Sequence, residues 1–275
     1  MKVERVGKYL LYIGLVIVAV IQIFPLIWLF LFSLKDNREI FSGSPFALPT
    51  EFRWQNYQKV WEGGIGTYFW NSVWITALAI LLTVILASMA TFAITRMTWK
   101  LSGLVLGLFM VGLMIPIHSS IIPLFSMFLN VNLIDSPWSI VITYTAYNLP
   151  ITIMILLGFY YTFPREIEEA AIIDGCSIHR LFFKIVLPMT TPVLSTTVII
   201  NMIYNWNEFV FVNTFISSDK YKTLTVGIQN FVGQYMTDWG AIGATLIISV
   251  LPILVAFLFF SNKVVEGISA SAIKG

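Results

Sequence analysis

Six long apolar stretches, separated by more polar segments, are the feature that most constrains the fold of this chain. Because the interior of a bilayer holds no water, a crossing segment must satisfy its own backbone hydrogen bonds, and about 20 apolar residues in a helix achieve this. Of the 275 residues, 58% are hydrophobic and 11% are charged, whereas soluble domains carry about 25% charged residues. We therefore expect one all-α integral membrane domain over residues 1–275, with six transmembrane helices at about 10–34, 70–94, 102–127, 138–161, 189–211 and 241–260.

Two features refine these predicted spans. The first apolar stretch is too long for the core of a signal peptide and lacks a cleavage site of small residues, so we expect it to remain as a span. Pro116, Pro123 and Pro150 fall inside predicted spans. Helices packed among neighbours tolerate proline, so we expect bends rather than helix ends there.

Basic residues are divided unequally between the two predicted sides of the membrane. Of the 16 Lys and Arg residues, ten lie on the side of the termini, and the other side has six: Lys35, Arg38, Arg53, Lys59, Lys220 and Lys222. Cytoplasmic flanks are enriched in Lys and Arg, so both termini are predicted to be cytoplasmic and the segment 35–69 to be external. The net charge of +2 gives no indication of nucleic acid binding, and the lipid bilayer is the expected environment.

The longest predicted cytoplasmic loop, residues 163–188, has the pattern of two short helices joined by a turn. Pro164 suits the first turn of a helix, and Gly175 suits a left-handed residue just after its end. Ser177 is a plausible N-cap for a second helix that runs to Leu187, where Pro188 opens the fifth span. Acidic residues are favourable near a helix N-terminus, and three lie there: Glu166, Glu168 and Glu169.

The composition of this loop predicts a docking element for another protein. Ala170 and Ala171 add little bulk to the first helix, so a partner's surface can approach closely. Apolar side chains that could anchor the contact are Ile167, Ile173, Ile178 and Leu181.

The spacing of residues in this loop resembles the EAA motif of the permease subunits of ABC importers. Glu169-Ala170-Ala171 is followed by three residues, Gly175, nine residues, Ile185, one residue and Leu187-Pro188, although Cys176 departs from the alanine usual in the family. In that family the loop is a coupling helix, seated in a cleft of an ATPase subunit and moved when ATP closes the ATPase dimer. The alternative is an amphipathic surface hairpin, which a bare Glu-Ala-Ala triplet would fit more easily than the full spacing does. The resemblance implies that the ATPase-coupling residues are Glu169, Ala170, Ala171, Asp174, Gly175, Ile185, Leu187 and Pro188.

Two further segments resemble the carbohydrate-uptake permeases of that family, in particular the second permease of maltose-type systems. Ser33-Leu34-Lys35, Pro45 to Pro49 and Asn56-Tyr57 are similar to the exit from the first span, and Asn71-Ser72 to the start of the second. The end of the predicted cytoplasmic tail, 262–275, is similar to the short tail of that permease, with Ser271 in place of an expected glycine; a frayed terminus is the alternative.

The resemblance as a whole implies a type I ABC importer permease architecture with a cytoplasmic coupling helix. It implies import of a sugar or oligosaccharide through a pathway of which this chain forms half. The implied partners are a second permease subunit, two ATP-binding-cassette ATPase subunits and an extracytoplasmic solute-binding protein. ATP and Mg would bind to the ATPase, and this chain itself would need no cofactor.

The fifth predicted span carries polar side chains at helical spacing, which form one stripe: Thr197, Asn201, Asn205 and Glu208. Amides and carboxylates can bind sugar hydroxyls, and Tyr204 and Trp206 could offer aromatic faces, so the stripe is a candidate substrate pathway. Alternatively, the amides join neighbouring helices and Glu208 reaches interfacial water. Weaker candidates of the same kind are Tyr144, Tyr147, Asn148 and His118, the last more commonly structural.

The sequence contains no motif for catalysis or for metal binding. Gly7-Lys8 lacks the upstream glycine and the following hydroxyl residue of a phosphate-binding loop. One cysteine excludes an internal disulfide, and two histidines without partner cysteines argue against a zinc site. We therefore expect a chain that is not an enzyme. Alternatives are a permease for a solute such as a glycerol phosphate, a self-contained secondary transporter, which would need coupling charges or an inverted repeat, and a membrane scaffold.

Overall fold

The computed structural model describes residues 2–44, 46–162, 164–233 and 237–272, with side chains described only between residues 7 and 259. Pro45 of the predicted exit motif, Phe163 at the start of the predicted coupling loop and the last three residues of the predicted tail lie outside the described residues. Within those ranges every regular element is helical, and the one β-bridge, between Val232 and Thr237, is isolated. The prediction of an all-α chain is confirmed.

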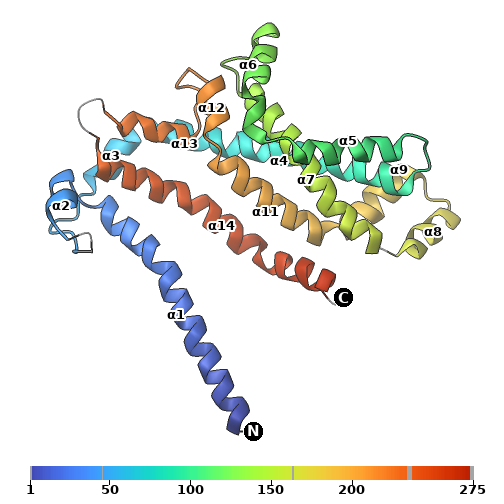
Figure 1. The fold of residues 1–275 in the computed structure, drawn as a ribbon, viewed down its shortest axis with the longest axis horizontal. Coiled ribbons are helices and arrows are strands. Elements are labelled where there is room, and N and C mark those ends of the chain that lie inside the picture. Colours follow the sequence, from blue (N-terminus) through green and yellow to red (C-terminus); the bar gives the residue numbers. More distant parts are fainter. Residues whose placement is uncertain (1, 45, 163, 234–236, 273–275) are drawn as a thin grey trace. The chain divides into compact units, whose positions relative to one another are not determined.

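The helices follow one another along the chain as labelled in Figure 1. They are α1 (Lys2–Ser33), α2 (Asn37–Ser42), α3 (Gln55–Glu62), α4 (Ile65–Arg96), α5 (Ser102–Met114), η1 (Ile117–Ser120), α6 (Ile121–Asn130), α7 (Pro137–Thr162), α8 (Arg165–Ile173), α9 (Ile178–Leu181), the π-helical turn η2 (Phe182–Val186), α10 (Leu187–Met189), α11 (Thr191–Asn207), α12 (Val210–Phe215), α13 (Leu224–Gly227), η3 (Ile228–Phe231) and α14 (Trp239–Ala272).

Four segments among the described residues are long and apolar enough to cross a membrane: Gly7–Ser33 of α1, Ile65–Arg96, Pro137–Thr162 and Trp239–Phe259 of α14. They correspond to the first, second, fourth and sixth predicted spans. Two bent helix pairs raise the number to as many as six if each pair is one span: Ser102–Met114 with Ile117–Asn130, and Ile178–Met189 with Thr191–Asn207. α14 continues through Ala272, so the described part of the predicted tail is helical.

The third predicted span is not one continuous helix. α5 ends at Met114, and the chain bends by 99° before η1 and α6. Ile115 is extended, with ψ of 121°, as expected for a residue that precedes proline. Pro116 has no N–H to continue the helix, and α5 alone, at about 1.5 Å per residue, is shorter than the hydrocarbon thickness. Pro150, in contrast, lies inside α7 as predicted.

The fifth predicted span also differs at both ends. The helix that precedes α11 runs through Pro188 to Met189, and a 71° bend separates it from Thr191, so Pro188 does not open the span. At the other end, α11 stops at Asn207, and Glu208 is extended with ψ of 129°. Residues 210 and 211, predicted to lie in the span, belong to the separate helix α12.

The chain divides into two compact units. Unit 1 comprises the chain up to residue 66 with residues 227–251, and unit 2 comprises residues 67–226 with the chain from residue 252. In unit 2, α7 packs between α5 and α11, while α12 packs against α6 and α7 (Figure 1). The largest buried cluster of unit 2 joins α4, α6, α7 and α12 and includes Ile75, Phe128, Tyr144, Phe211 and Phe215.

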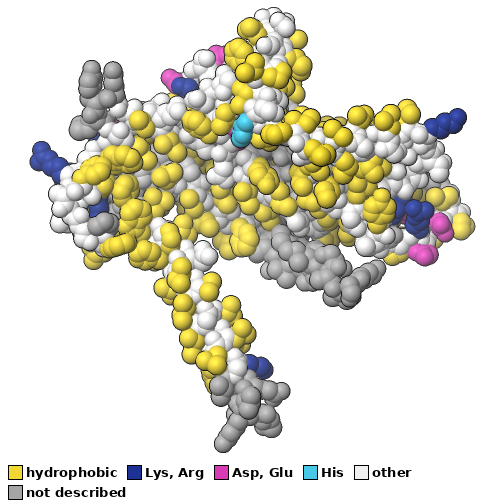
Figure 2. Space-filling view, in the orientation of Figure 1, with side chains coloured by type: hydrophobic (Ala, Val, Ile, Leu, Met, Phe, Trp, Pro, Cys, Tyr) yellow, Lys and Arg dark blue, Asp and Glu magenta, His cyan; other side chains and the backbone are white. Residues whose placement is uncertain are grey.

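Unit 1 contains α1, whose apolar side chains are exposed. None of its most apolar 18-residue window is buried, and Figure 2 shows hydrophobic side chains along it. Elsewhere unit 1 is tightly packed where α14 begins. A Cβ on Gly240 would lie 2.5 Å from the carbonyl oxygen of Lys35 and would also clash with the Asn56 amide. Only glycine fits this contact without a shift of the backbone.

We expect Gly240→Ala to destabilise unit 1 by about 1–3 kcal/mol, because the added methyl group must displace backbone atoms. Thermal unfolding of the detergent-solubilised protein, followed by the loss of its monodisperse size-exclusion peak, measures the effect. Gly158→Ala in α7 is the matched control, since a Cβ there meets nothing within 4 Å. Equal unfolding temperatures for both variants would contradict the packing described.

Candidate functional site

The predicted helical hairpin is present between α7 and α11. α8 ends at Ile173, and Gly175 has the left-handed φ of 78° that its sequence position predicted. The N–H of Gly175 donates to the Ile172 carbonyl at 3.0 Å and that of Cys176 to the Ala171 carbonyl at 3.0 Å, which closes the turn. Ser177 occupies the N-cap position of α9, as predicted, although its side chain makes no capping hydrogen bond. The second arm then runs through α9, η2 and α10.

The two sides of α8 differ in burial. Glu168 and Ala171 are buried, whereas Glu169, Ala170 and Ile173 are exposed. Ile173 is 85% exposed, which is unusual for a large apolar side chain, and charged side chains lie near it. Figure 2 shows these neighbouring Lys, Arg, Asp and Glu side chains clustered at this end of unit 2. The outer side of α8 is therefore suited to contact with a partner protein.

The remaining predicted coupling residues are distributed along the hairpin. Asp174 and Gly175 are exposed in the turn, and Pro188 is exposed in α10. Ile185 and Leu187 are half-buried and pack against a cluster of buried side chains that belongs to the hairpin and to the ends of α4 and α7. Their role in the structure is to hold the second arm of the hairpin against these helices.

An ion pair that no sequence pattern indicates anchors α8 to α4. Arg96, the last residue of α4, donates from Nε to Glu168 Oε1 at 2.8 Å, and the two side chains are 7% and 8% exposed. Arg96 Nη2 also donates to the Tyr160 carbonyl of α7 at 3.1 Å. In the sequence, Arg96 was one basic residue flanking a span and Glu168 one acidic residue of a helix N-terminus, so neither pattern indicated their pairing.

The polar stripe of α11 faces α7. Asn148 Nδ2 donates to Asn205 Oδ1 at 2.8 Å, and Asn201 Nδ2 donates to the Thr152 hydroxyl at 3.1 Å. Thr197 is fully buried in the same line. Among the described residues, the second polar atoms, Asn201 Oδ1 and Asn205 Nδ2, are buried without a hydrogen-bond partner. The amides thus join two helices and keep unused hydrogen-bonding capacity.

The aromatic residues predicted to accompany the stripe do not lie together. Tyr204 is 65% exposed, on a different side of α11 from Asn201 and Asn205. Trp206 is buried, and its ring centroid lies 6.1 Å from that of Phe69 of α4. The structure brings Asn148, Asn201 and Asn205 together and leaves these two aromatic residues apart from them.

Glu208 lies at the break between α11 and α12 rather than on a continuous helix. Its carboxylate accepts hydrogen bonds from the backbone N–H groups of Phe211 at 2.9 Å and Val212 at 3.4 Å, so it caps α12. The Tyr144 hydroxyl donates to it at 3.3 Å, and His118 Nε2 lies 4.0 Å from it. Capping therefore supplies this carboxylate with hydrogen-bond donors in an apolar segment.

Aromatic rings surround this carboxylate. The rings of Tyr147 and Phe211 are stacked with centroids 5.4 Å apart, and the His118 ring lies 5.5 Å from that of Phe211. The Tyr147 hydroxyl donates to the Ile117 carbonyl at 2.9 Å, near the bend between α5 and η1. Together with Glu208, these groups bring hydrogen-bonding atoms and aromatic rings to one place, which the stripe alone does not.

The end of α4 remote from Arg96 is also fixed by polar contacts. Asn71 Nδ2 donates to the carbonyls of Lys220 at 2.8 Å and Lys222 at 2.9 Å, and the Leu224 N–H donates to the Ser72 hydroxyl at 2.9 Å. The Asn71-Ser72 pair of the sequence thus holds the loop before α13. From Asn71 to Arg96 the helix extends about 38 Å at about 1.5 Å per residue, enough to cross the hydrocarbon core.

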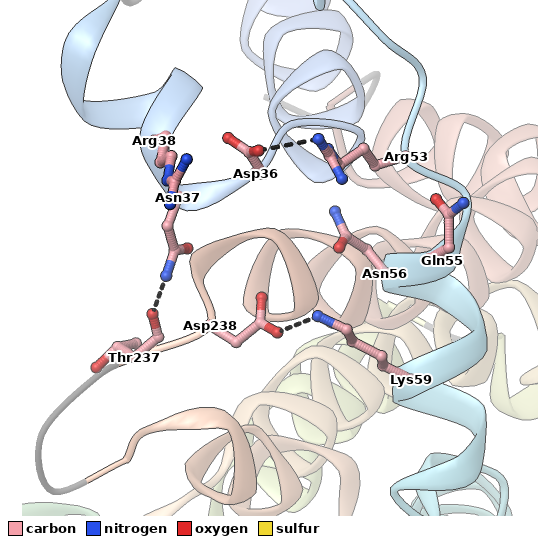
Figure 3. A pocket seen from close by; sticks show the side chains of 9 residues that line it. All are labelled: Asp36, Asn37, Arg38, Arg53, Gln55, Asn56, Lys59, Thr237 and Asp238. Carbon is pink, nitrogen blue, oxygen red and sulfur yellow. Dashed lines mark hydrogen bonds and ion pairs between the residues drawn. The ribbon is translucent and has the colours of Figure 1, made fainter.

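Unit 1 contains a polar cavity of about 440 Å³ (Figure 3). At its edges Arg53 pairs with Asp36 at 3.1 Å, Lys59 pairs with Asp238 at 2.9 Å, and Asn37 donates to the Thr237 carbonyl at 2.7 Å. Figure 3 shows these pairs linking the segment after α1, the helix α3 and the start of α14. Within the described residues, no group of three His, Cys, Asp or Glu side chains could hold a metal ion.

The exit motif of the first span has a structural role beside this cavity. Asn56 Nδ2 donates to the carbonyls of Ser33 at 2.8 Å and Lys35 at 2.9 Å, which terminates α1 and fixes the chain that follows. The hydroxyls of Ser33 and Tyr57 lie 2.7 Å apart. Burial raises the pKa of the Tyr57 phenol above its ordinary value, so this tyrosine stays neutral.

Comparison with known proteins agrees with this architecture. Residues 79–266 match the model of a family described as binding-protein-dependent transport system inner membrane component. The diacetylchitobiose uptake system permease of Streptomyces coelicolor is 33% identical over 93% of this chain and 85% of its own length. The trehalose/maltose transport system permease of Thermococcus litoralis is 32% identical and covers all of both chains.

A solved structure has the same fold. A chain of a bacterial ABC transporter involved in the import of the acidic polysaccharide alginate superposes with a TM-score of 0.79, covering 95% of this chain and 98% of that chain. The two sequences are 18% identical, so this likeness concerns the fold alone. It confirms the prediction of an importer permease architecture.

We expect Asn148→Ala and Asn205→Ala each to lower the stability of unit 2, because each removes one side of a buried amide pair. The double variant should lose about 0.6 kcal/mol less unfolding free energy than the sum of the losses in the two single variants. This is the mean coupling for polar pairs between membrane helices. A double-mutant cycle of unfolding in mixed micelles measures this coupling. Strictly additive costs would contradict a direct bond between the two amides.

Proposed function

Because this chain belongs to the family of binding-protein-dependent transport system inner membrane components, we propose that it forms half of the translocation pathway of an ATP-driven importer for a sugar or oligosaccharide. Family membership makes it a multi-pass membrane protein and a permease subunit. The observation that carries the sugar proposal is that two permeases named for sugar uptake align with 93% and 100% of this chain.

The charge distribution supports a neutral substrate. None of the six predicted spans contains Lys or Arg, so this half of the pathway offers no cation within the membrane to a phosphorylated solute. The names of these two relatives give no support to a glycerol phosphate as substrate. A self-contained secondary transporter and a membrane scaffold are both at odds with the family.

We place the contact with the ATPase on the outer side of α8. Glu169 and Ala170 are exposed there, together with Ile172, which is 57% exposed, and Ile173. Exposed isoleucines lose contact with water when a partner covers them, and small Ala170 lets that partner approach the helix closely. Gly175 fixes the turn after α8, because its φ of 78° is strained for any other residue. Asp174 and the second-arm residues Ile185, Leu187 and Pro188 complete this coupling element.

The assembly we propose contains a second permease, two ATPase subunits and an extracytoplasmic solute-binding protein. ATP and Mg bind to the ATPase subunits, and this chain is not an enzyme. Both termini and α8 lie on the cytoplasmic side, consistent with the excess of basic residues there. Asn71 and the Lys220–Lys222 loop, at the opposite end of α4, then lie on the outer side.

For the substrate pathway we propose the region of α7 and α11 that ends at Glu208. Unused amide atoms of Asn201 and Asn205, the Asn148 amide and the Tyr144–Glu208 pair offer hydrogen bonds to hydroxyl groups. The proposal includes Tyr204 and Trp206 only because they lie on α11. Neither is on the same side of the helix as the amides. Sugars bind through such amides and carboxylates combined with ring faces, and the half-buried ring of Tyr147, stacked on the buried Phe211, provides one.

The proposed function predicts uptake that requires every partner. Vesicles that contain both permeases and the ATPase should accumulate a labelled disaccharide only with ATP and the binding protein present. Ile173→Ser should weaken ATPase association about tenfold, as expected when an apolar anchor of an interface is removed, and lower uptake accordingly. Pull-down of the ATPase and the uptake rate measure the two effects.

Leu101→Ser is the matched control for Ile173→Ser. Leu101 is a 55% exposed apolar residue at the same end of unit 2, between α4 and α5 rather than on α8. ATPase association of this variant should change less than about twofold. Uptake by this chain without an ATPase, or equal losses in both variants, would overturn the proposal.

The pathway proposal predicts that Glu208→Gln lowers uptake, because the amide cannot accept as many hydrogen bonds as the carboxylate. We expect a loss of about tenfold with ATPase association unchanged. Asn207→Ala serves as control, since the exposed Asn207 amide donates to its own helix, at the Ile203 carbonyl. If uptake by Glu208→Gln equals that of the parent protein, Glu208 serves α12 alone.

A further inference from the structure

The buried ion pair between Arg96 and Glu168 joins three helices at one point. Arg96 ends α4, Glu168 lies in the first half of α8, and Tyr160 lies in the last turn of α7. Besides its bonds to Glu168 and the Tyr160 carbonyl, the Arg96 guanidinium lies 5.4 Å from the centroid of the Tyr160 ring. Arg96 therefore contacts both other helices with one rigid planar group.

Helix-terminal electrostatics favour each of these contacts. The Tyr160 carbonyl is among the last four of α7, which have no partner within the helix, so Arg96 satisfies one of them. A cation is favourable at that end of α7, and a carboxylate is favourable near the N-terminus of α8. The pair is thus specified by the ends of all three helices.

Apolar packing reinforces this junction. A buried cluster beside the ion pair contains Phe92 of α4, Tyr160 of α7 and Ala171 of α8, together with Leu181, Phe182 and Val186 of the second arm. Glu168 and Ala171, three residues apart on α8, form its inward side. The side of α8 that faces α4 and α7 is buried, and the opposite side is free to meet a partner.

Stability alone does not explain a buried ion pair. Removing two charges from water costs about as much as their attraction returns, so well-packed apolar residues would hold the helices equally firmly. An ion pair differs in being directional, because the guanidinium fixes the carboxylate in one orientation. A junction that must transmit a displacement without slipping needs this property.

We propose that the Arg96–Glu168 ion pair positions α8 so that its displacement by the ATPase moves α4 and α7 directly; this inference rests on the proposed function. The covalent route from α8 to α11 passes through the π-helical turn η2 and the 71° bend at Thr190, which interrupt the regular helix. The route through Arg96 instead enters the end of the long helix α4. At its other end, α4 holds the loop of Lys220 and Lys222 through Asn71.

The two adjacent glutamates of α8 then have separate roles. Glu169 is exposed and meets the partner, whereas Glu168 is buried and holds α8 to the permease. Loss of Glu169 should weaken ATPase association. Loss of Glu168 should instead leave the ATPase bound and active while fewer solute molecules enter per ATP hydrolysed.

The test uses the complete transporter reconstituted in vesicles and measures sugar uptake and ATP hydrolysis in the same sample. Glu168→Gln keeps the size of the side chain and removes its charge. We expect ATPase association within about twofold of the parent, with the uptake per ATP reduced about two- to thirtyfold, the range of coupling changes seen along such networks. Glu166→Gln, at an exposed glutamate of the same helix, should leave uptake per ATP unchanged.

A charge-swapped variant separates positioning from simple packing. Arg96→Glu combined with Glu168→Arg restores opposite charges and should recover part of the uptake per ATP lost in Glu168→Gln. Should these variants fail to assemble, Arg96→Lys decides, because it keeps the charge but cannot hold Glu168 and the Tyr160 carbonyl together. It should assemble and still lower uptake per ATP.

The outcomes distinguish this inference from the proposed function. If the parent transporter shows no ATP-driven uptake, the proposed function itself fails. If the parent is active and uptake per ATP in Glu168→Gln and Arg96→Lys equals that of the parent, only the inference about the ion pair fails. The same holds if uptake and hydrolysis fall in equal proportion, since that result indicates a purely structural role.

Discussion

Every backbone N–H and C=O group inside the hydrocarbon must find a partner within the protein, and the fold follows from this constraint. It makes α4, α7 and the apolar part of α14 long helices, and it makes a break such as that at Ile115–Pro116 noteworthy, because a proline removes a donor there. The same reasoning applies to side chains. The amides of Asn148 and Asn205 meet each other, and the Glu208 carboxylate accepts the free N–H groups at the start of α12.

The contact with the ATPase that we propose is arranged by burial on the two sides of one short helix. On the outer side, Ile173 and Glu169 are exposed for a partner, and on the inner side Glu168 is paired with Arg96. A helix with both functions can receive a displacement on one side and pass it on from the other. In our proposal, the length of α4 from Arg96 to Asn71 brings that displacement to the opposite end of the helix and to the loop that Asn71 holds.

Helical spacing in a sequence shows which residues share a side of a helix, but not whether the helix continues. The stripe of α11 faces α7 as its spacing indicates, yet the helix ends at Asn207, and Glu208 turns to cap the next helix. Trp206 and Tyr204 lie apart from the stripe because they point to other sides of the helix. Trp206 packs against Phe69, and Tyr204 is exposed. The rings that stack near Glu208 are instead those of Tyr147 and Phe211, which belong to different segments.

The sequence by itself determined the all-α membrane class, the position of most of the long apolar helices and the hairpin turn at Gly175, because these depend on hydrophobicity and on backbone preferences over short distances. The family could likewise be inferred from the spacing between Glu169 and Pro188. Only the tertiary structure decided which glutamate is buried, which arginine it meets, and that Asn71 holds a loop some 150 residues further along. Such contacts join residues far apart in the chain, and their energies depend on distance and burial, which no local pattern encodes.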